Sequence, residues 1–324
     1  MINSRKYTNI IVTGSIAYDE IMDFPGKFIN YFHPDKLHQI NVSFVVNKLI
    51  KQIGGTATNI AYNAQLKLSF SGLENKVRIF GAVGKDGDIF LDFFAKNKIE
   101  TQGLIIDKKL YTASGKVITD IKDNQIWGFY YGASIRGKKI KLNKFTDKNS
   151  LLILSANQKD AFLSFQKQAI KNNLDYLYDP GMCLTWIKKS ELKTGILNSK
   201  YLIGNDYEIS QILKASGLTK KNILNKDVSL ITTLGEQGVT YEDRRNKLII
   251  KAFPVKKVAD PTGAGDAWRG GFAAGLVEGL SLPDCLKTAN VMASFAVEKY
   301  GTVNHSPTEK EMKKRRNVLK VSKV

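Results

Sequence analysis

The sequence that decides the fold reads Asp260-Pro261-Thr262-Gly263-Ala264-Gly265-Asp266 and continues in small residues through position 275. Proline suits the entry of a helix but not its interior, and the glycines leave the backbone amides beside them uncovered. Amides at the start of a helix bind anions. The stretch therefore predicts a helix that begins as an anion cradle, with the amides of Gly263, Ala264 and Gly265 as donors.

Asp266 falls in the first turn of this predicted helix. A carboxylate there lies beside the bound anion, where it can accept the proton of an attacking hydroxyl. The stretch thus favours a phosphoryl-transfer site with Asp266 as the base. The alternative is a glycine-rich turn whose aspartate only complements the helix dipole.

The composition favours a globular enzyme. With 324 residues, 43% of them hydrophobic, the chain is long enough for one large α/β domain with a real core. No run approaches the ~18 apolar residues of a membrane span, and the N-terminus lacks a signal-peptide pattern, so we expect a cytoplasmic protein without a membrane partner. Cys183 and Cys285 stand far apart in the sequence, which argues against a disulfide framework or a zinc site.

The net charge of +19 raises a second class of protein, the nucleic-acid binders. Of the 49 basic residues only 8 are arginine, although phosphates and base edges recruit the guanidinium fork. The lysines are also scattered, apart from the basic run at residues 313–316. A general lysine bias explains the charge, so we expect no specific nucleic-acid partner and a basic tail that frays after about Lys310.

Short apolar runs alternate with amphipathic stretches along the chain. The runs are typical of buried parallel strands and occupy residues 10–13, 77–81, 151–155, 176–178, 201–203 and 228–232. The amphipathic stretches predict helices at residues 59–68, 87–96, 161–172 and 208–215. This alternation predicts an α/β fold with a doubly wound, mostly parallel sheet flanked by helices, in which ligands bind beyond the carboxyl ends of the strands.

Two stretches interrupt the alternation. Residues 23–52 are rich in aromatic and β-branched side chains, and within residues 108–132 apolar and polar residues alternate before an aromatic cluster around Trp127. Both patterns are typical of antiparallel strands. Because each stretch leaves and rejoins the α/β pattern, we expect one small β-sheet lid on a single domain of residues 1–324. Uncovered strand edges pair between chains, so a homodimer through the lid is a further hypothesis.

Other polar residues and glycines stand near predicted strands. Asp19 follows the first apolar run, where a carboxylate can hold sugar hydroxyls. Gly55 permits close approach of the backbone, and Asn59 can both donate to and accept from a polyol. A turn aspartate and an ordinary glycine turn are the alternatives.

Asn205 and Glu208 follow the apolar run at residues 201–203. They fit an N-cap with its capping-box partner, or a pair that orients hydrated Mg²⁺, which prefers oxygen ligands. Residues 232–238 offer hydroxyls and glycines for a nucleotide, or form a hairpin turn. Residues 290–296 predict a core helix that a glycine ends.

Several enzyme classes are excluded by missing motifs. The chain has neither a Walker A pattern nor the protein-kinase set of glycine, catalytic and metal-binding loops. Its three histidines stand in no recognisable arrangement with a serine or cysteine nucleophile. A kinase with this sequence must therefore be of another type.

Six motifs stand in an order that characterises one family, at residues 14–19, 54–59, 81–87, 205–208, 233–238 and 260–266. On these motifs the chain resembles the ribokinase-like (PfkB) carbohydrate and nucleoside kinases over essentially its whole length. The resemblance implies the ribokinase-like fold with its lid, and a kinase that uses ATP and Mg²⁺. It also admits activation by a monovalent cation such as K⁺.

The N-terminal third looks most like the bacterial adenosine kinases of this family, on residues 13–19, 24–28, 37–44 and 54–59. That likeness implies adenosine as the acceptor, with Asp266 taking the proton of its 5′-hydroxyl. The implied nucleoside contacts are Ser15, Asp19, Ser43, Phe44, Gly55 and Asn59. The implied nucleotide contacts are Asn205, Thr233, Gly235, Gly238 and Asn290, with Mg²⁺ near Glu208 and Asn205 through water.

Two departures from the family pattern and two alternatives stay open. Thr58 stands where the pattern has a small residue, and Trp268 where it has Phe. A sugar kinase of the same family acting on ribose or fructose is one alternative, because Asp19, Asn59 and Asp266 serve both acceptors. A non-catalytic binding protein is the other, although its base and cradle would be expected to be damaged.

Overall fold

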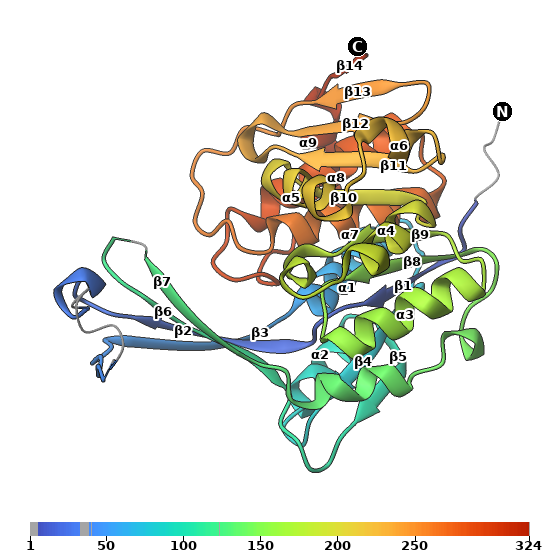
Figure 1. Cartoon of the computed structure of the whole chain (residues 1–324). Helices are drawn as coiled ribbons and strands as arrows, with labels where there is room; N and C mark the ends of the chain where they lie inside the picture. Colours follow the sequence, from blue (N-terminus) through green and yellow to red (C-terminus); the bar gives the residue numbers. More distant parts are fainter. Residues whose placement is uncertain (1–5, 33–38, 40, 123, 324) are drawn as a thin grey trace.

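The computed structural model describes residues 6–32, 39, 41–122 and 124–323, which form two β-sheets of different size (Figure 1). Within these residues the larger sheet has ten strands, in the order β14-β13-β12-β11-β10-β9-β8-β1-β4-β5. Their bounds are β1 (Asn9–Thr13), β4 (Val77–Val83), β5 (Glu100–Ile106), β8 (Ser150–Ser155), β9 (Tyr176–Asp179), β10 (Tyr201–Asn205), β11 (Ser229–Thr233), β12 (Val239–Glu242), β13 (Lys247–Ile250) and β14 (Val321–Lys323).

The larger sheet is parallel from β5 to β11 and antiparallel from β11 to β14. β1 and β8 are buried along their whole length, which explains why the sequence shows continuous apolar runs instead of alternation. Five of the six predicted apolar runs lie within one of these strands, and the run at residues 228–232 begins one residue before β11. The predicted mostly parallel sheet is confirmed.

Helices cover both faces of this sheet (Figure 1). Ile10 and Val12 of β1 belong to one buried cluster and Ile11 to the other, because successive side chains of a strand point to opposite faces. The first cluster includes side chains of α1 (Thr56–Ser69), α2 (Asp88–Lys96), α7 (Ala264–Glu278), α8 (Leu282–Ala296) and α9 (Glu309–Val318). The second includes side chains of α3 (Lys159–Lys171), α4 (Lys189–Leu197), α5 (Asp206–Ser216) and α6 (Lys220–Leu224). Among the helices described, none has the length and apolar character needed to cross a membrane.

The smaller sheet forms the predicted lid and projects from one side of the larger sheet (Figure 1). Its order is β3-β2-β6-β7, with bounds β2 (Ala17–Asp23), β3 (Lys48–Gly54), β6 (Ala113–Thr119) and β7 (Gln125–Tyr130). Two details of the prediction were wrong. The lid begins at Ala17 instead of near residue 23, and β2 pairs with β6 in parallel, because both strands leave the larger sheet in the same direction. The single-domain organisation stays a prediction.

The basic tail is ordered, so the prediction that it frays was wrong. Thr308 caps α9 by accepting a hydrogen bond from the amide of Glu311, and β14 then pairs with β13. Arg315 of α9 lies 3.7 Å from the ring centroid of Phe295 and donates to Glu298 at 2.7 Å. These contacts anchor a segment whose composition alone suggests a solvated end.

The segment between α8 and α9 is fastened to α1 by His305, of which 2% is exposed. The Nε2 atom of His305 lies 2.6 Å from Oδ1 of Asn63, and Tyr62 donates to the backbone oxygen of His305. Asn63 also donates to the backbone oxygen of Asn59 at 2.9 Å. The segment is therefore held against the start of α1, close to the candidate site described below.

We expect His305 to make stability fall at acidic pH. Burial lowers its pKa from 6.5 to about 4. Because the unfolded chain binds the proton first as the pH falls, the stabilisation is complete above about pH 6.5 and is lost towards pH 4, at up to ~1.4 kcal/mol per pH unit. Urea unfolding from about pH 4 to 8 should show a flatter pH dependence for His305→Gln than for the wild type. Equal slopes would contradict this role of His305.

Candidate active site

The candidate site lies at the carboxyl edge of the parallel strands. Ser155 is in register with Asp179 on the neighbouring strand, and Asn205 is in register with Thr233. The ends of β8, β9, β10 and β11 therefore bring four polar side chains to the same edge of the sheet, as expected for a doubly wound fold. Sequence analysis missed Asp179, although the Asp-Pro-Gly that follows the apolar run at residues 176–178 was a signal for it.

The anion cradle forms at the N-terminus of α7. Gly263 is the N-cap, with φ of 79°, and a Cβ on it would lie 2.8 Å from Cγ2 of Thr302. Among the described residues, the amides of Gly263, Gly265 and Asp266 have no hydrogen-bond partner, whereas the amide of Ala264 donates to the oxygen of Pro261 at 3.3 Å. Unpaired amides at a helix start are the arrangement that binds an anion. The role of residues 263–265 as an anion hole stays a prediction.

Asp260 shapes the loop that leads into the cradle. Its Oδ1 accepts from the amide of Thr262 at 2.9 Å, and its Oδ2 accepts from the amide of Gly301 at 3.0 Å. One buried carboxylate thus joins the turn before α7 to the segment after α8. The sequence motif contained Asp260, but its partner Gly301, 41 residues away along the chain, becomes visible only in the fold.

Asp266 lies in the first turn of α7, as predicted, and faces Asn59 of α1. The side-chain amide of Asn59 donates from Nδ2 to Oδ2 of Asp266 at 2.9 Å. Burial raises the pKa of Asp266 to about 7, against the opposing charge of Arg269 and the hydrogen bond from Asn59. Part of the residue stays open to solvent, so a hydroxyl can reach it. A carboxylate with a pKa near neutrality, within reach of substrate, has the properties of a general base.

Asp19 lies within lid strand β2, so its predicted position at the carboxyl end of the first strand was wrong. The chain leaves β1 and turns before residue 17, and β2 then pairs along its length with β3 and β6. A Cβ on Gly54 would lie 2.1 Å from Oδ2 of Asp19, so the carboxylate occupies the space that a side chain there would fill. Burial raises the pKa of Asp19 to about 6, and the charge of Asp260 adds to the effect.

Ser15 and Gly55 build the start of α1. The hydroxyl of Ser15 accepts from the amide of Thr56 at 3.1 Å, and the amide of Ala57 donates to the backbone oxygen of Ser15 at 3.0 Å. Gly55 has φ of 86°, and a Cβ on it would lie 2.5 Å from that same oxygen. Their observed contacts hold α1, and with it Asn59, in place. Direct contact of Ser15 or Gly55 with an acceptor stays a prediction.

Two residues predicted to meet the nucleoside, Ser43 and Phe44, follow a part of the lid that lies outside the described residues. Ser43 is exposed and Phe44 is half-buried. The ring of Phe44 packs on Phe24 and Phe28, with centroid distances of 4.7 and 5.2 Å. Phe44 thus belongs to an aromatic cluster, and the predicted contact of both residues with substrate is untested.

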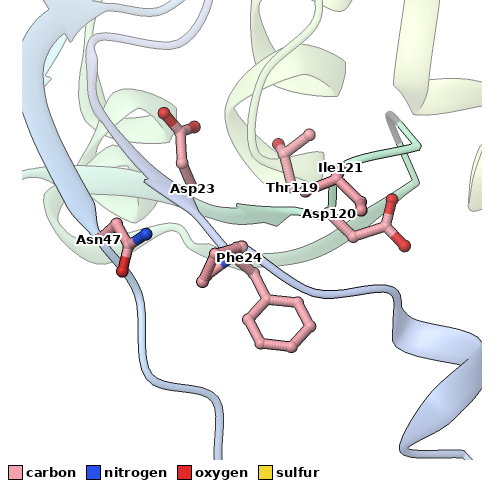
Figure 2. Close-up of a pocket in the computed structure, with 7 residues that line it drawn as sticks. Asp23, Phe24, Asn47, Thr119, Asp120 and Ile121 are labelled. Carbon is pink, nitrogen blue, oxygen red and sulfur yellow. The ribbon is translucent and has the colours of Figure 1, made fainter.

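A cavity of about 280 Å³ lies beside this cluster, at the end of the lid where β2 ends at Asp23 (Figure 2). Asp120 lines it, and the Oδ2 of Asp120 accepts from the amide of Phe28 at 2.9 Å. Its Oδ1 accepts from the amides of Lys122 and Asn124. The Asp120 carboxylate therefore closes a turn of the lid, and the cavity is not part of the site around Asp266.

Asn205 and Glu208 form a complete capping box at the start of α5. The side chain of Asn205 accepts from the amide of Glu208 at 2.7 Å, and the Glu208 carboxylate accepts from the amide of Asn205 at 2.8 Å. The capping interpretation of this motif is confirmed. Glu208 keeps a second carboxylate oxygen and lies at the carboxyl edge of the sheet, so a role near a metal is compatible with the cap.

The residues predicted to bind nucleotide differ in how much free space surrounds them. Thr233 ends β11, and Gly235 has no atom within 4 Å of the position of a Cβ, so the turn between them is open. Gly238 has the opposite surroundings, because a Cβ there would lie 2.1 Å from the oxygen of Ile250. Asn290 is buried, accepts from Trp268 at 2.7 Å and donates to the backbone of residues 250–251. Direct contact of these residues with a nucleotide stays a prediction.

The residues around Glu208 fit a hydrated metal ion and not an enclosed one. Among the described residues, no group of three His, Cys, Asp or Glu side chains is arranged to hold a metal. Mg²⁺ commonly keeps several waters and takes one or two carboxylates together with phosphate oxygens. One carboxylate at the carboxyl edge of the sheet satisfies that requirement, and the role of Glu208 as a ligand through water stays a prediction.

A model of the pfkB family carbohydrate kinases matches residues 23–309. A nucleoside kinase of Methanothermobacter thermautotrophicus is 27% identical over 313 residues, which cover 95% of each chain. A ribokinase of Lactococcus lactis is 30% identical over 262 residues, 76% of this chain and 82% of the ribokinase. The structure of a nucleoside kinase of Burkholderia thailandensis in complex with inosine is 28% identical, with a TM-score of 0.83 over 95% of this chain and 97% of that one.

The family match includes most of the lid, residues 263–265 and Asp266. The TM-score of 0.83 over 95% of this chain shows that the overall fold is shared. The chain therefore belongs to the pfkB family of carbohydrate kinases, enzymes that transfer a phosphoryl group to a hydroxyl.

Proposed function

We propose that this protein is a nucleoside kinase that transfers the γ-phosphoryl group of ATP to the 5′-hydroxyl of a purine nucleoside, adenosine first. The observation that carries the proposal is a pair of aromatic rings on the lid. Asp19, Gly115 and Phe129 are register partners across β2, β6 and β7, so they share one face of the lid with Trp127. The rings of Trp127 and Phe129 are exposed on the same face of the lid as Asp19, where a ligand can contact them.

The two rings lie directly over the bare backbone of Gly115. A Cβ on Gly115 would lie 3.2 Å from Trp127 and 3.4 Å from Phe129. Trp127 is 53% exposed and Phe129 36%, which is unusual for rings that rest on a sheet. Next to a carboxylate suited to ribose hydroxyls, they offer a stacking surface for a base. A free sugar has no aromatic ring that could stack on it face to face.

The relatives support the same assignment. Nucleoside kinases are matched over nearly the whole chain, and the Burkholderia structure carries inosine, a purine nucleoside. The Lactococcus ribokinase keeps a sugar kinase acting on ribose as the second candidate. Trp127 and Phe129 favour the nucleoside, because a base has a flat aromatic face that can stack on their rings and a free pentose has none.

The proposed mechanism assigns one task to each group. Asp19 holds the ribose hydroxyls, Asn59 orients the carboxylate of Asp266, and Asp266 takes the proton of the 5′-hydroxyl as that oxygen attacks. The cradle amides face the charge that develops on the transferred group. Mg²⁺, held through water by Glu208, would neutralise the phosphate charge of ATP. Closure of the lid would exclude water, which otherwise competes with the acceptor.

Further expectations accompany this proposal. ATP is expected along the turn at Thr233 and Gly235, and a monovalent cation such as K⁺ is expected to activate. The exposed lid strand β7, whose residues are all solvent-accessible, is expected to pair in a homodimer, which sedimentation at several concentrations would detect. We expect a cytoplasmic protein without a specific nucleic-acid partner.

A panel of acceptors with Mg·ATP tests the function. Adenosine, inosine, guanosine, cytidine, ribose and fructose are compared at equal concentration by ADP release. A purine nucleoside should give the highest kcat/KM. Preference for ribose or fructose would support the sugar-kinase alternative, and turnover of none of them would support a binding protein.

Trp127→Ala should separate base binding from ribose binding. Base stacking on an aromatic ring contributes ~1–3 kcal/mol, so the KM for adenosine should rise about tenfold or more, while the KM for ribose, where turnover is measurable, stays unchanged. Ile126→Ala is the matched control, because Ile126 is 41% exposed on the opposite face of the same strand. An adenosine KM that is equal in both variants would argue against the stacking surface.

A further inference from the structure

A buried arginine that has no task in the mechanism above lies next to the cradle. Arg269 follows Asp266 by three positions on α7, so both side chains project from the same side of the helix. Its Nη2 donates to Oδ1 of Asp179 at 2.9 Å, and its Nε lies 2.7 Å from Oδ2. Side-chain exposure is 8% for Arg269 and 6% for Asp179. Helix α7 and the end of β9 are thus joined by a bidentate ion pair.

A contribution to folding stability does not by itself explain the ion pair between Arg269 and Asp179. Removing two charges from water costs several kcal/mol per ion, and their attraction often does no more than offset it. Apolar side chains at the two positions would hold α7 on β9 as well or better. A buried arginine at the edge of an anion site therefore calls for a functional explanation.

One edge of the guanidinium stays free and borders the cradle. A Cβ on Gly265 would lie 2.8 Å from Nη1, so Arg269 reaches the backbone of the cradle itself. Within the described part of the chain, Nη1 donates to no acceptor, whereas Nη2 donates to Asp179 and Nε lies close to the same carboxylate without a hydrogen bond. Two N–H groups of a fixed cation are therefore left for a ligand.

The surrounding carboxylates keep the guanidinium of Arg269 ionised. Burial disfavours its charge, but the carboxylates of Asp179, Asp266 and Glu208 outweigh burial and raise the pKa of Arg269. Asp179 ends β9, Asp266 is the proposed base, and Glu208 is the proposed metal ligand. Arg269 therefore interacts electrostatically with the residue proposed to activate the acceptor and with the residue proposed to hold the metal.

We propose that Nη1 of Arg269 donates to the phosphoryl group during transfer, and that Asp179 is the positioning residue that aims the guanidinium. The inference rests on the proposed function. In the step, the acceptor oxygen bonds to the γ-phosphorus while the bond from that phosphorus to the bridging oxygen breaks, and ADP leaves with the electron pair. The hydroxyl proton passes to Asp266, and Arg269 exchanges no proton. Its charge stabilises the equatorial oxygens.

Arg269→Gln tests the inference. Loss of a preorganised donor at a developing charge lowers kcat by ~10²–10³-fold, with the KM for the acceptor little changed. Arg269→Lys should recover a part of this, because an ammonium cannot bind Asp179 in bidentate form and still reach the phosphoryl group. The matched control is Arg136→Gln, which breaks another arginine–carboxylate pair, with Nε 2.5 Å from Oδ2 of Asp107. That variant should keep the wild-type kcat.

The pH profile distinguishes this role from a structural brace. Burial raises the pKa of Asp266 and the charge of Arg269 opposes it, so Arg269→Gln should move the acid limb of kcat/KM to higher pH. A folded Arg269→Gln with near-wild-type kcat and an unmoved limb would overturn the inference. If that variant does not fold, the double variant Asp179→Asn with Arg269→Gln removes both buried charges, and the same loss of kcat is expected of it.

A second readout needs no acceptor and keeps the inference separate from the proposed function. With Mg·ADP, aluminium fluoride mimics the phosphoryl group in transfer, and it should raise the Tm of the wild type and of Arg136→Gln above the value with Mg·ADP alone. Arg269→Gln should lose this increase. An increase that persists in Arg269→Gln, or that is absent from the wild type, would overturn the arginine assignment. Failure of nucleoside turnover alone would overturn only the proposed function, because a sugar acceptor uses the same phosphoryl site.

Discussion

Asp266→Asn is expected to lower kcat by ~10²–10⁴-fold, the usual contribution of a positioned general base. The asparagine oxygen can still accept from Asn59, whose nitrogen lies 2.9 Å from Oδ2 in the wild type, so the local packing is preserved. Binding of the acceptor, measured by calorimetry, should therefore change little. A variant with near-wild-type turnover would remove Asp266 from the mechanism.

The pH dependence provides an independent check on the same residue. Because burial raises the pKa of Asp266 to about 7, wild-type kcat/KM should fall as the pH drops below about 7, where the carboxylate is protonated. The residual activity of Asp266→Asn should lack this limb. The raised pKa also means that ionisation costs folding stability as the pH rises from about 4 to 7, so above pH 7 the variant is expected to be at least as stable as the wild type.

Gly263→Ala is expected to lower kcat/KM by ~10²-fold by displacing the cradle. At φ of 79° an alanine is strained, and its Cβ would lie 2.8 Å from Cγ2 and 2.9 Å from Cβ of Thr302. Thr302 is 2% exposed and cannot move aside easily. The backbone of residue 263 must shift instead, and the free amides at the start of α7 shift with it. Steady-state kinetics with Mg·ATP and the preferred acceptor measure the loss.

Gly72→Ala is the matched control for this substitution. Gly72 has φ of 66°, so the conformational penalty for alanine is similar, but no atom lies within 4 Å of the added Cβ. Its turn follows α1 and is distant along the chain from the cradle. We expect a lower Tm with unchanged kcat/KM. If the two variants lose the same stability and neither loses activity, the close contact with Thr302 has no catalytic consequence.

The position of residues 263–266 at the start of α7 was predictable because the motif lies within seven consecutive residues. Local rules suffice there, since glycine conformation and helix-terminal amides depend only on neighbours along the chain. The buried strands were predictable for a related reason, because a strand covered on both faces must be a continuous apolar run. Where a residue serves both a local and a distant purpose, as Asn205 and Glu208 do in their capping box, sequence left two interpretations and the structure confirmed the local one.

Partnerships across the chain were decided by the tertiary structure. Asp19 was expected at a strand end, but the register with Gly115 and Phe129 places it on the lid face that carries the exposed rings. Arg269 and Asp179 are 90 residues apart, and nothing in either segment indicates the other. The expectation for the tail was wrong because its composition is basic, whereas its order depends on contacts with Phe295 and Glu298 near the end of the preceding helix.

The sequence by itself determined the order of strands and helices, the position of residues 263–266 at the start of a helix, and the family. Each of these depends on periodicity or on neighbours a few positions apart, which the linear chain records directly. Only the tertiary structure decided which groups surround Asp266, which face of the lid carries Trp127, and that a guanidinium borders the cradle. These depend on sheet register and helix packing, which bring together residues far apart in the chain, such as Asn59 and Asp266, which are 207 positions apart.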